Sequence, residues 1–171
     1  EKISLAIFDK MKQVHGLGKR ERLLLQIAVL LHDCGKYINM ALSSECSYNI
    51  IMATEIIGLS HREREIVANV VRFNSGPVLE FEELASGSTL EQADYMTIVK
   101  LTAILRVANA LDRSHKQKIK EVRVSWKDPH TMQIFVDTLE DLTLEQALFH
   151  EKAEFFESVF SIRPVLKAKR V

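Results

Sequence analysis

Apolar residues in the first 112 positions recur with the spacing of helices. One helix face carries Ile3, Ile7, Met11 and Val14, and Gly16 and Gly18 end that helix. The segment that starts at residue 19 is so broadly apolar that most of its surface must be buried. Further helices are expected over residues 48–57, 60–73 and 92–112, with one helical turn over 80–85. Capping-box spacing at residues 60–63 predicts the start of the second of these helices.

The periodicity of the C-terminal part is that of strands. Alternation over residues 122–126 and again over 132–136 predicts a β-hairpin. A helix over 144–160, preceded by a capping box at 143–146, and a strand over 162–168 are expected to follow. The expected fold class is mainly α, with a helical core over residues 1–115 and a small α+β (ββαβ) subdomain over residues 116–171 packed on it.

The composition is that of an ordinary soluble domain, with 47% apolar and 27% charged residues in a chain of 171. Its 23 basic and 23 acidic side chains give a net charge of zero, which argues against a protein that coats nucleic acid without sequence specificity. Two cysteines are too few for a disulfide-rich secreted scaffold, and residues 27–31, the longest strongly apolar run, are too few to span a bilayer. We expect a cytoplasmic piece of a longer protein, since Glu1 already lies in a helical pattern, and no membrane partner.

Candidate chemistry is concentrated where the broadly apolar helix ends, in the sequence LLHDCGK at residues 30–36. The adjacent His32 and Asp33 offer an imidazole and a carboxylate, a pair of ligands that suits divalent cations such as Mg²⁺, Mn²⁺ or Zn²⁺. A structural role fits equally, because histidine is favoured at a helix C-terminus and aspartate caps backbone groups or pairs with arginine. Lys36 has two interpretations as well, a phosphate contact or a complement to the helix C-terminus.

The wholly apolar helix that leads into His-Asp-x-Gly-Lys resembles the HD phosphohydrolase superfamily. The stretch LTAILRVANALDRS, residues 101–114, closely resembles a late helix in the HD-type domain of the exopolyphosphatase/guanosine pentaphosphate phosphohydrolase (Ppx/GppA) family. Shorter segments that resemble the same family are residues 15–17, 47–48 and 58–60. The resemblance extends from the first helix through the ββαβ tail, and it implies an HD-domain-like helical core.

The resemblance also implies a role within a larger phosphatase. Members of the family carry an N-terminal actin-like phosphatase module, which holds the phosphate-cleaving groups and would be a partner of this chain. Their HD-like domain helps to form a basic passage for polyphosphate and contributes to a homodimer. We therefore expect an accessory domain of an enzyme that removes terminal phosphate from polyphosphate or guanosine pentaphosphate, with no required cofactor and no specific nucleic-acid partner.

The chain departs from the metal pattern of HD enzymes. Asn109 stands where the family often has aspartate, and Asn74 where relatives often have histidine. Because His32 and Asp33 alone fall short of the three protein ligands usual for catalytic zinc, we expect them to form a structural hydrogen-bonded pair. We expect Arg106 to complete this degenerate HD site by pairing with Asp33. The alternative is a metal at His32 and Asp33, and with it a metal-dependent HD phosphohydrolase acting on a nucleotide or phosphomonoester.

Charge is segregated along this neutral chain. Cations dominate residues 113–123 and the tail from residue 163, whereas acids dominate residues 137–157. If the last strand pairs with the hairpin, the two basic segments lie close together and suit a linear polyphosphate. The alternative is a solvated surface without a ligand, in a pure dimerisation or interaction module. The candidate polyanion-binding residues are Lys36, Arg113, Lys116, Lys118, Lys120, Arg123, Lys167, Lys169 and Arg170.

Overall fold

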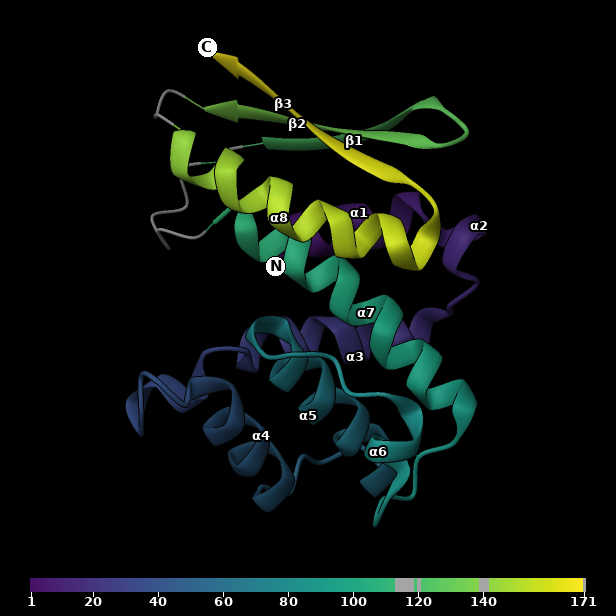
Figure 1. The fold of residues 1–171 in the computed structure, drawn as a ribbon, viewed down its shortest axis with the longest axis vertical. Coiled ribbons are helices and arrows are strands. Elements are labelled where there is room, and N and C mark those ends of the chain that lie inside the picture. Colours follow the sequence, from purple (N-terminus) through teal and green to yellow (C-terminus); the bar gives the residue numbers. More distant parts are fainter. Residues whose placement is uncertain (113–118, 120, 139–141, 171) are drawn as a thin grey trace. The chain divides into compact units, whose positions relative to one another are not determined.

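The computed structural model describes residues 1–112, 119, 121–138 and 142–170, and for residues 169 and 170 it describes the backbone alone. Within these residues the chain is mainly helical, and its C-terminal part forms a three-stranded mixed sheet with a helix between the second and third strands (Figure 1). The expected fold class, a helical core followed by a ββαβ unit, is confirmed. None of the described helices is both long and apolar enough to cross a membrane.

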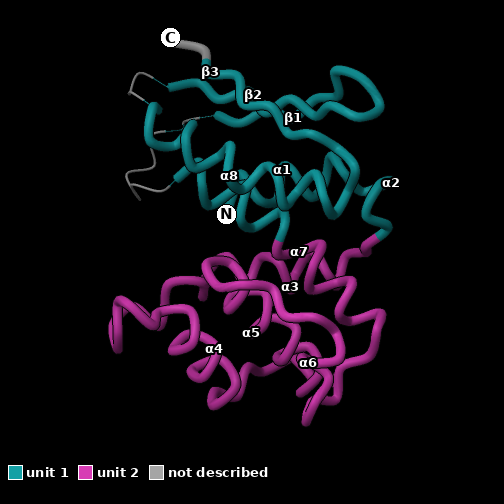
Figure 2. The backbone as a smooth tube through the Cα atoms, in the orientation of Figure 1, with its two compact units in different colours: residues 1–16, 103–171 teal, residues 17–102 magenta. Residues whose placement is uncertain are grey.

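The chain divides into two compact units (Figure 2). One unit contains residues 17–102, and the other combines residues 1–16 with residues 103–171. The positions of the two units relative to one another are not determined. The domain boundary expected between residues 115 and 116 lies outside the described residues and stays a prediction.

Helices form the whole regular structure of the unit of residues 17–102. Its elements are α3 (Lys19–Leu31), the 3₁₀ helix η1 (Cys34–Tyr37), α4 (Ser43–Ala53), α5 (His61–Ser75), α6 (Phe81–Ala85) and the start of α7 (Gln92–Ala110). α5 packs against both α3 and α4 and buries every residue from 65 to 71. The predicted capping box starts α5: the Glu63 N–H donates to Ser60 Oγ at 3.2 Å, and the Ser60 N–H donates to Glu63 Oε2 at 2.8 Å.

α4 lies earlier in the chain than the helix expected over residues 48–57. The side chain of Asn39 explains the early start, because its Oδ1 accepts the N–H groups of Ala41 and Leu42 at 2.9 and 3.1 Å and closes a turn directly before Ser43. The helix ends at Ala53 because the backbone of Thr54 is extended, with ψ 136°.

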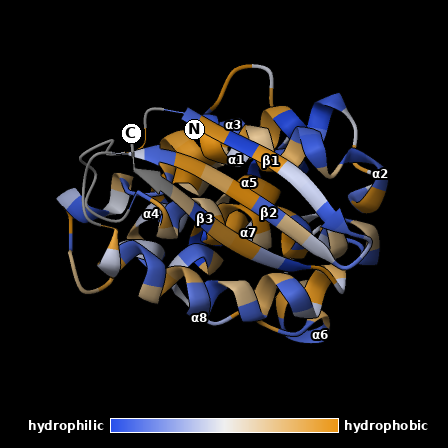
Figure 3. Cartoon of the chain, turned by 90° about the horizontal axis from the view of Figure 1, so that it is seen from above, coloured by the Kyte–Doolittle hydropathy of each residue, from blue (hydrophilic) through white to orange (hydrophobic). Residues whose placement is uncertain are grey.

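The other unit is built around the sheet. β1 (Glu121–Asp128) and β2 (Thr131–Thr138) form the expected antiparallel hairpin, and β3 (Arg163–Arg170) pairs in parallel with β2 through the crossover helix α8 (Thr143–Phe160). The sheet order is β1–β2–β3. α1 (Lys2–Lys10) packs on β1 and α8 packs on β3. Figure 3 looks down on the sheet and shows α8 running along its β3 edge.

The two faces of the sheet differ in burial. Met132, Ile134 and Val136 of β2 are fully buried, whereas the residues between them are only partly covered. Figure 1 shows α1 and α8 on the same side of the sheet. Alternation therefore turns one face of each strand toward these helices and leaves the other face open.

Two predicted boundaries in this unit are wrong. The first helix does not continue to residue 14, because Met11 (φ −93°, ψ 9°) interrupts it, and a separate α2 (Lys12–His15) follows. Gly16 ends α2 in the left-handed region, at φ 69°. α8 does not start with a capping box at residues 143–146: its N-cap is the buried Leu142, which makes no side-chain cap bond.

Candidate functional site

His32 and Asp33 lie together where α3 ends. His32 is the C-cap residue of α3, and Asp33 is the N-cap residue of η1. The Nδ1 atom of His32 lies 2.7 Å from the carbonyl oxygen of Val29. Because a carbonyl only accepts, Nδ1 carries the hydrogen of this bond and Nε2 faces Asp33. The distance from His32 Nε2 to Asp33 Oδ2 is 3.5 Å, longer than a good hydrogen bond.

The ammonium group of Lys36 lies closer to the carboxylate of Asp33 than the imidazole of His32 does. Its Nζ lies 2.7 Å from Asp33 Oδ2, one turn further along the chain. Both side chains are about one-third exposed, at 30% and 34%. This ion pair at i,i+3 spacing neutralises the carboxylate within the loop itself.

Gly35 holds this loop against α4. The Gly35 N–H donates to Ser47 Oγ at 2.8 Å, and a Cβ at this position would overlap the backbone carbonyl of Ser43 and the backbone nitrogen of Ser47. Only glycine allows so close an approach of η1 to α4. The glycine of the His-Asp-x-Gly-Lys sequence is therefore explained by packing.

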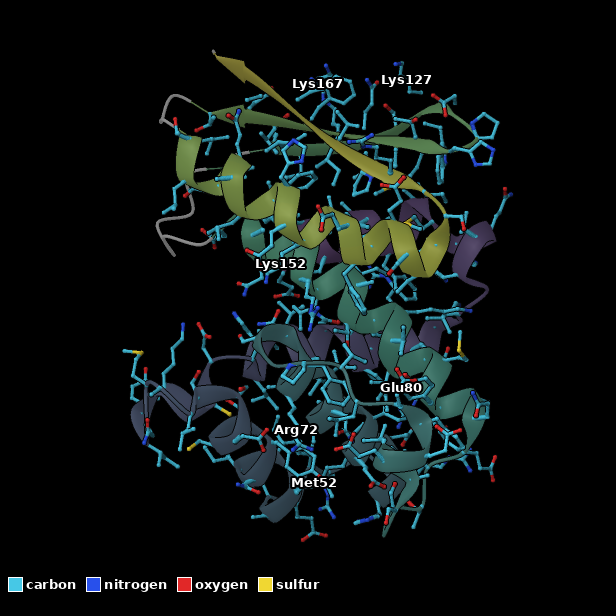
Figure 4. The ribbon with its side chains drawn as sticks, viewed as in Figure 1. Met52, Arg72, Glu80, Lys127, Lys152 and Lys167 are labelled. Atoms are coloured by element: carbon cyan, nitrogen blue, oxygen red, sulfur yellow. The ribbon has the colours of Figure 1, made fainter. Side chains whose placement is uncertain are left out.

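A second charged contact joins α4 to α5. The Nε of Arg72 donates to Glu45 Oε1 at 2.7 Å, and its guanidinium lies over the ring of Tyr48, 5.2 Å from the ring centre. Figure 4 labels Arg72 on α5. Burial raises the pKa of the Tyr48 hydroxyl. Asn74, two residues beyond Arg72, is buried, and the described residues give its Oδ1 no hydrogen-bond partner.

The donors at the end of α3 do not make a closed metal site. No three His, Cys, Asp or Glu side chains gather as metal ligands among the described residues. The carboxylate of Asp33 already lies 2.7 Å from the ammonium group of Lys36, which competes with any cation for the same oxygen. Metal binding by His32 and Asp33 stays a prediction, and these donors support no metal-dependent step.

Arg106 and Asn109 lie on the part of α7 that belongs to the unit with the sheet. The guanidinium of Arg106 lies over the ring of Phe155 on α8, 4.5 Å from the ring centre. Burial lowers the pKa of this guanidinium, and the charge of Glu151 opposes that shift. Asp33 belongs to the other unit, so the expected Arg106–Asp33 pair stays a prediction.

The open face of the sheet carries Arg123 and Lys167 of the candidate polyanion site. The register aligns Arg123 of β1, Phe135 of β2 and Lys167 of β3 in one row across the strands. Lys167 is exposed and, in Figure 4, lies on the side of the sheet away from α8. Arg123 lies 3.8 Å from Asp137 but keeps 69% of its side chain exposed.

Lys36, another predicted residue of the polyanion site, lies on η1 in the unit of residues 17–102, where it pairs with Asp33. Arg113, Lys116, Lys118 and Lys120 lie outside the described residues. Lys169 and Arg170 continue β3 in register with Asp137 and Thr138 of β2. The strands β1 and β3, which carry Arg123 and Lys167, do not pair directly, because β2 lies between them. Neighbouring strands are about 5 Å apart, so about 10 Å separates the two outer strands.

The comparison with protein families agrees with the sequence resemblance. A model of the Ppx/GppA phosphatase family, domain III, matches residues 1–153. No curated protein matches the sequence. The match covers most of the 171 residues, from α1 to the middle of α8. The chain therefore belongs to the Ppx/GppA phosphatase family, in which it corresponds to domain III.

Proposed function

We propose that this domain supplies a polyanion-binding surface and a subunit contact to a phosphatase. The catalytic groups would lie in an N-terminal actin-like module of the parent protein, which would remove terminal phosphate from polyphosphate or guanosine pentaphosphate. Membership of the family supports the parent activity. The open face of the sheet supports the binding role.

The observation that carries the binding role is the row of exposed side chains across the sheet. Arg123 and Lys167 flank Phe135 from the two outer strands, and both are exposed. The contact of Arg123 with Asp137, at 3.8 Å and with 69% of the arginine side chain exposed, is too weak to hold the guanidinium away from a phosphate. A linear polyanion that crosses the strands can contact both cations, with a forked contact at arginine and a point charge at lysine.

The test replaces Arg123→Gln and Lys167→Gln together and measures polyphosphate binding over a range of salt concentrations. We expect weaker binding and a salt dependence reduced by about one to two ionic contacts. The matched control replaces Lys2→Gln and Lys12→Gln, which removes the same charge from exposed positions on α1 and α2. An affinity and salt dependence equal to those of the unchanged chain would contradict the proposal.

The subunit contact is supported by an apolar surface on the other unit. Large apolar side chains in residues 37–42 are exposed: Tyr37 by 96%, Ile38 by 67%, Met40 by 74% and Leu42 by 57%. Water-exposed apolar side chains this close together favour burial against a partner. Replacing Ile38→Ser and Met40→Ser is expected to shift the chain toward the monomer in sedimentation experiments, while Ile57→Ser, exposed by 98%, serves as control.

A further inference from the structure

A cavity of about 560 Å³ lies between α8 and β3, apart from the residues of the sites described above. All of its lining residues belong to the unit that contains the sheet. Phe149, Ala153 and Leu166 give it an apolar lining. We call it the α8–β3 groove, because α8 residues from 146 to 157 and β3 residues 163–166 form its two long walls.

The two walls of the groove carry opposite charges. α8 contributes Glu154 and Glu157, which are exposed and lie on one helix face at i,i+3 spacing. The sheet contributes Lys127 and Arg163, which are also exposed. Among the ion pairs of the described residues, none joins these carboxylates to these cations. A ligand in the groove therefore meets an acidic wall on one side and a basic wall on the other.

β3 also offers backbone hydrogen bonds along the groove. It is the edge strand of the described sheet. The Arg163 N–H donates toward β2, to the carbonyl oxygen of His130 at 2.8 Å. Because successive residues of a strand point their backbone groups to opposite sides, those of Pro164, Leu166 and Ala168 point to the open edge. Proline has no N–H, so Leu166 and Ala168 supply the donors there.

We propose that the α8–β3 groove binds an extended peptide, which adds as a strand to the open edge of β3. Its main chain pairs with Leu166 and Ala168. Its side chains alternate, and those that face α8 are basic or apolar, because they meet Glu154, Glu157 and Phe149. The side chains on the opposite side of the peptide are acidic, because they lie beside Arg163 and Lys167, which are exposed on the outward side of β3.

A second copy of β3 is a poor occupant of this edge. Arg163 and Lys167 are exposed on the outward side of the strand. Antiparallel pairing of two such strands would bring like charges together, which destabilises a sheet edge. Charge complementarity therefore favours a peptide of alternating sign over self-association.

The test uses synthetic peptides of eight residues with blocked ends, the length of β3. One peptide alternates acidic residues with basic and apolar ones. The control has the same composition with its charges in consecutive pairs, so that each face of the strand carries both signs. Fluorescence anisotropy is expected to show about tenfold tighter binding of the alternating peptide, since about two favourable ion pairs become mismatched in the control.

Variants of the chain locate the binding site. Glu154→Lys with Glu157→Lys is expected to weaken binding of the alternating peptide about tenfold, because both charges on the helix wall are reversed. Glu151→Lys reverses one charge on the same helix, outside the groove lining, and is expected to change affinity by less than about twofold. Ala168→Pro removes one outward N–H without removing a bond to β2, and it too is expected to weaken binding.

Amide signals in nuclear magnetic resonance supply a readout that does not depend on substitution. Peptide binding is expected to slow hydrogen exchange of the Leu166 and Ala168 amides more than that of Val165 and Lys167, which already face β2. Equal binding of the two peptides, unchanged affinity in both groove variants, or amide protection confined to other residues would overturn the proposal. Concentration-dependent dimerisation that Ala168→Pro abolishes would instead assign the edge to a second copy.

Discussion

Individual side chains at the end of α3 account for the sequence pattern of this loop through local contacts. Asp33 pairs with Lys36 at 2.7 Å, and Gly35 lies against the backbone of α4. Each of these contacts gives a residue of the His-Asp-x-Gly-Lys sequence a structural role within η1 and α4. Packing and a local ion pair are therefore enough to explain these two positions of the pattern.

Gly35→Ala is expected to destabilise the chain by about 2–4 kcal/mol, because the new Cβ overlaps backbone atoms of α4 that cannot move alone. Urea denaturation of the whole chain measures this loss. Gly18→Ala is the control: its Cβ would meet only the end of the flexible Glu21 side chain, at 3.2 Å. Equal stabilities of the two variants would show that η1 is not held by this close approach.

A pH-dependent contribution to stability resides at Glu63. Its hydrogen bonds from Arg20 and then from the backbone of Ser60 lower its pKa from 4.5 to about 2. Since the folded-state pKa lies below the unfolded value, the ionised carboxylate stabilises the fold above about pH 4.5, and this contribution is lost as the pH falls toward 2.

Glu63→Gln is therefore expected to reduce the free energy of unfolding at neutral pH by about 1 kcal/mol, a figure reduced for solvent screening of this partly exposed pair. The difference from the unchanged chain should shrink as the pH falls below 4.5. Denaturation at several pH values measures it, with the exposed Glu83→Gln as control. A difference that is constant with pH would refute the role of the charge.

How much of the site could be predicted depends on the range of the interaction. The capping box at Ser60 and Glu63 is local, and it was predicted correctly. The Lys36–Asp33 pair was missed, although opposite charges at i,i+3 spacing were a signal for it. Arg72 and Glu45 are 27 residues apart in the sequence, and no sequence pattern predicts their contact. The cation–π contact of Arg106 with Phe155 likewise depends on packing of α7 against α8.

Elements with a strong hydrophobic period were predicted well, and elements whose ends depend on turns were not. The alternation in β1 and β2 gave the hairpin and its buried face. α4 was misplaced because Asn39 sets its start through side-chain bonds that periodicity does not report. α8 starts at Thr143, one residue before the predicted start, and its N-cap is the buried Leu142 rather than Thr143.

The central strand of the sheet provides a test at the scale of elements. Ile134→Ala on β2 is expected to cost about 3 kcal/mol in the free energy of unfolding, because a fully buried side chain leaves a cavity between the sheet and its helices. Its neighbour Gln133→Ala, on the open face, is expected to cost less than about 0.5 kcal/mol. Thermal denaturation measures the loss of stability in both variants. Similar losses of the free energy of unfolding would contradict the assignment of a buried and an open face to β2.

For the whole molecule, the division into units separates a contiguous part from a discontinuous one. Residues 17–102 are continuous in sequence, whereas the other unit combines α1 with residues 103–171, which are far from it in the sequence. α1 packs on β1, with Ile7 and Phe8 buried. The first 16 residues are therefore part of the core of the sheet-containing unit.

We expect residues 17–102, produced alone, to remain helical and to unfold cooperatively, because their core is internal. Residues 103–171 alone are expected to lack a cooperative transition, because α1 is missing from the sheet. Circular dichroism melts compare the two, and adding a peptide of residues 1–16 should restore the transition of the second. A cooperative melt of residues 103–171 without that peptide would count against this division of the core.

The separation of α1 from its sheet has a consequence for synthesis on the ribosome. β1 starts roughly 110 residues after α1 ends, and at about 5–20 residues per second the intervening chain takes about 5–20 s to make. Throughout that interval, residues 17–102 can fold while the apolar face of α1, with Ile7, Phe8 and Met11, has no strand to cover it. The nascent chain thus presents a short apolar helix of the kind that chaperones bind, until its last strands emerge.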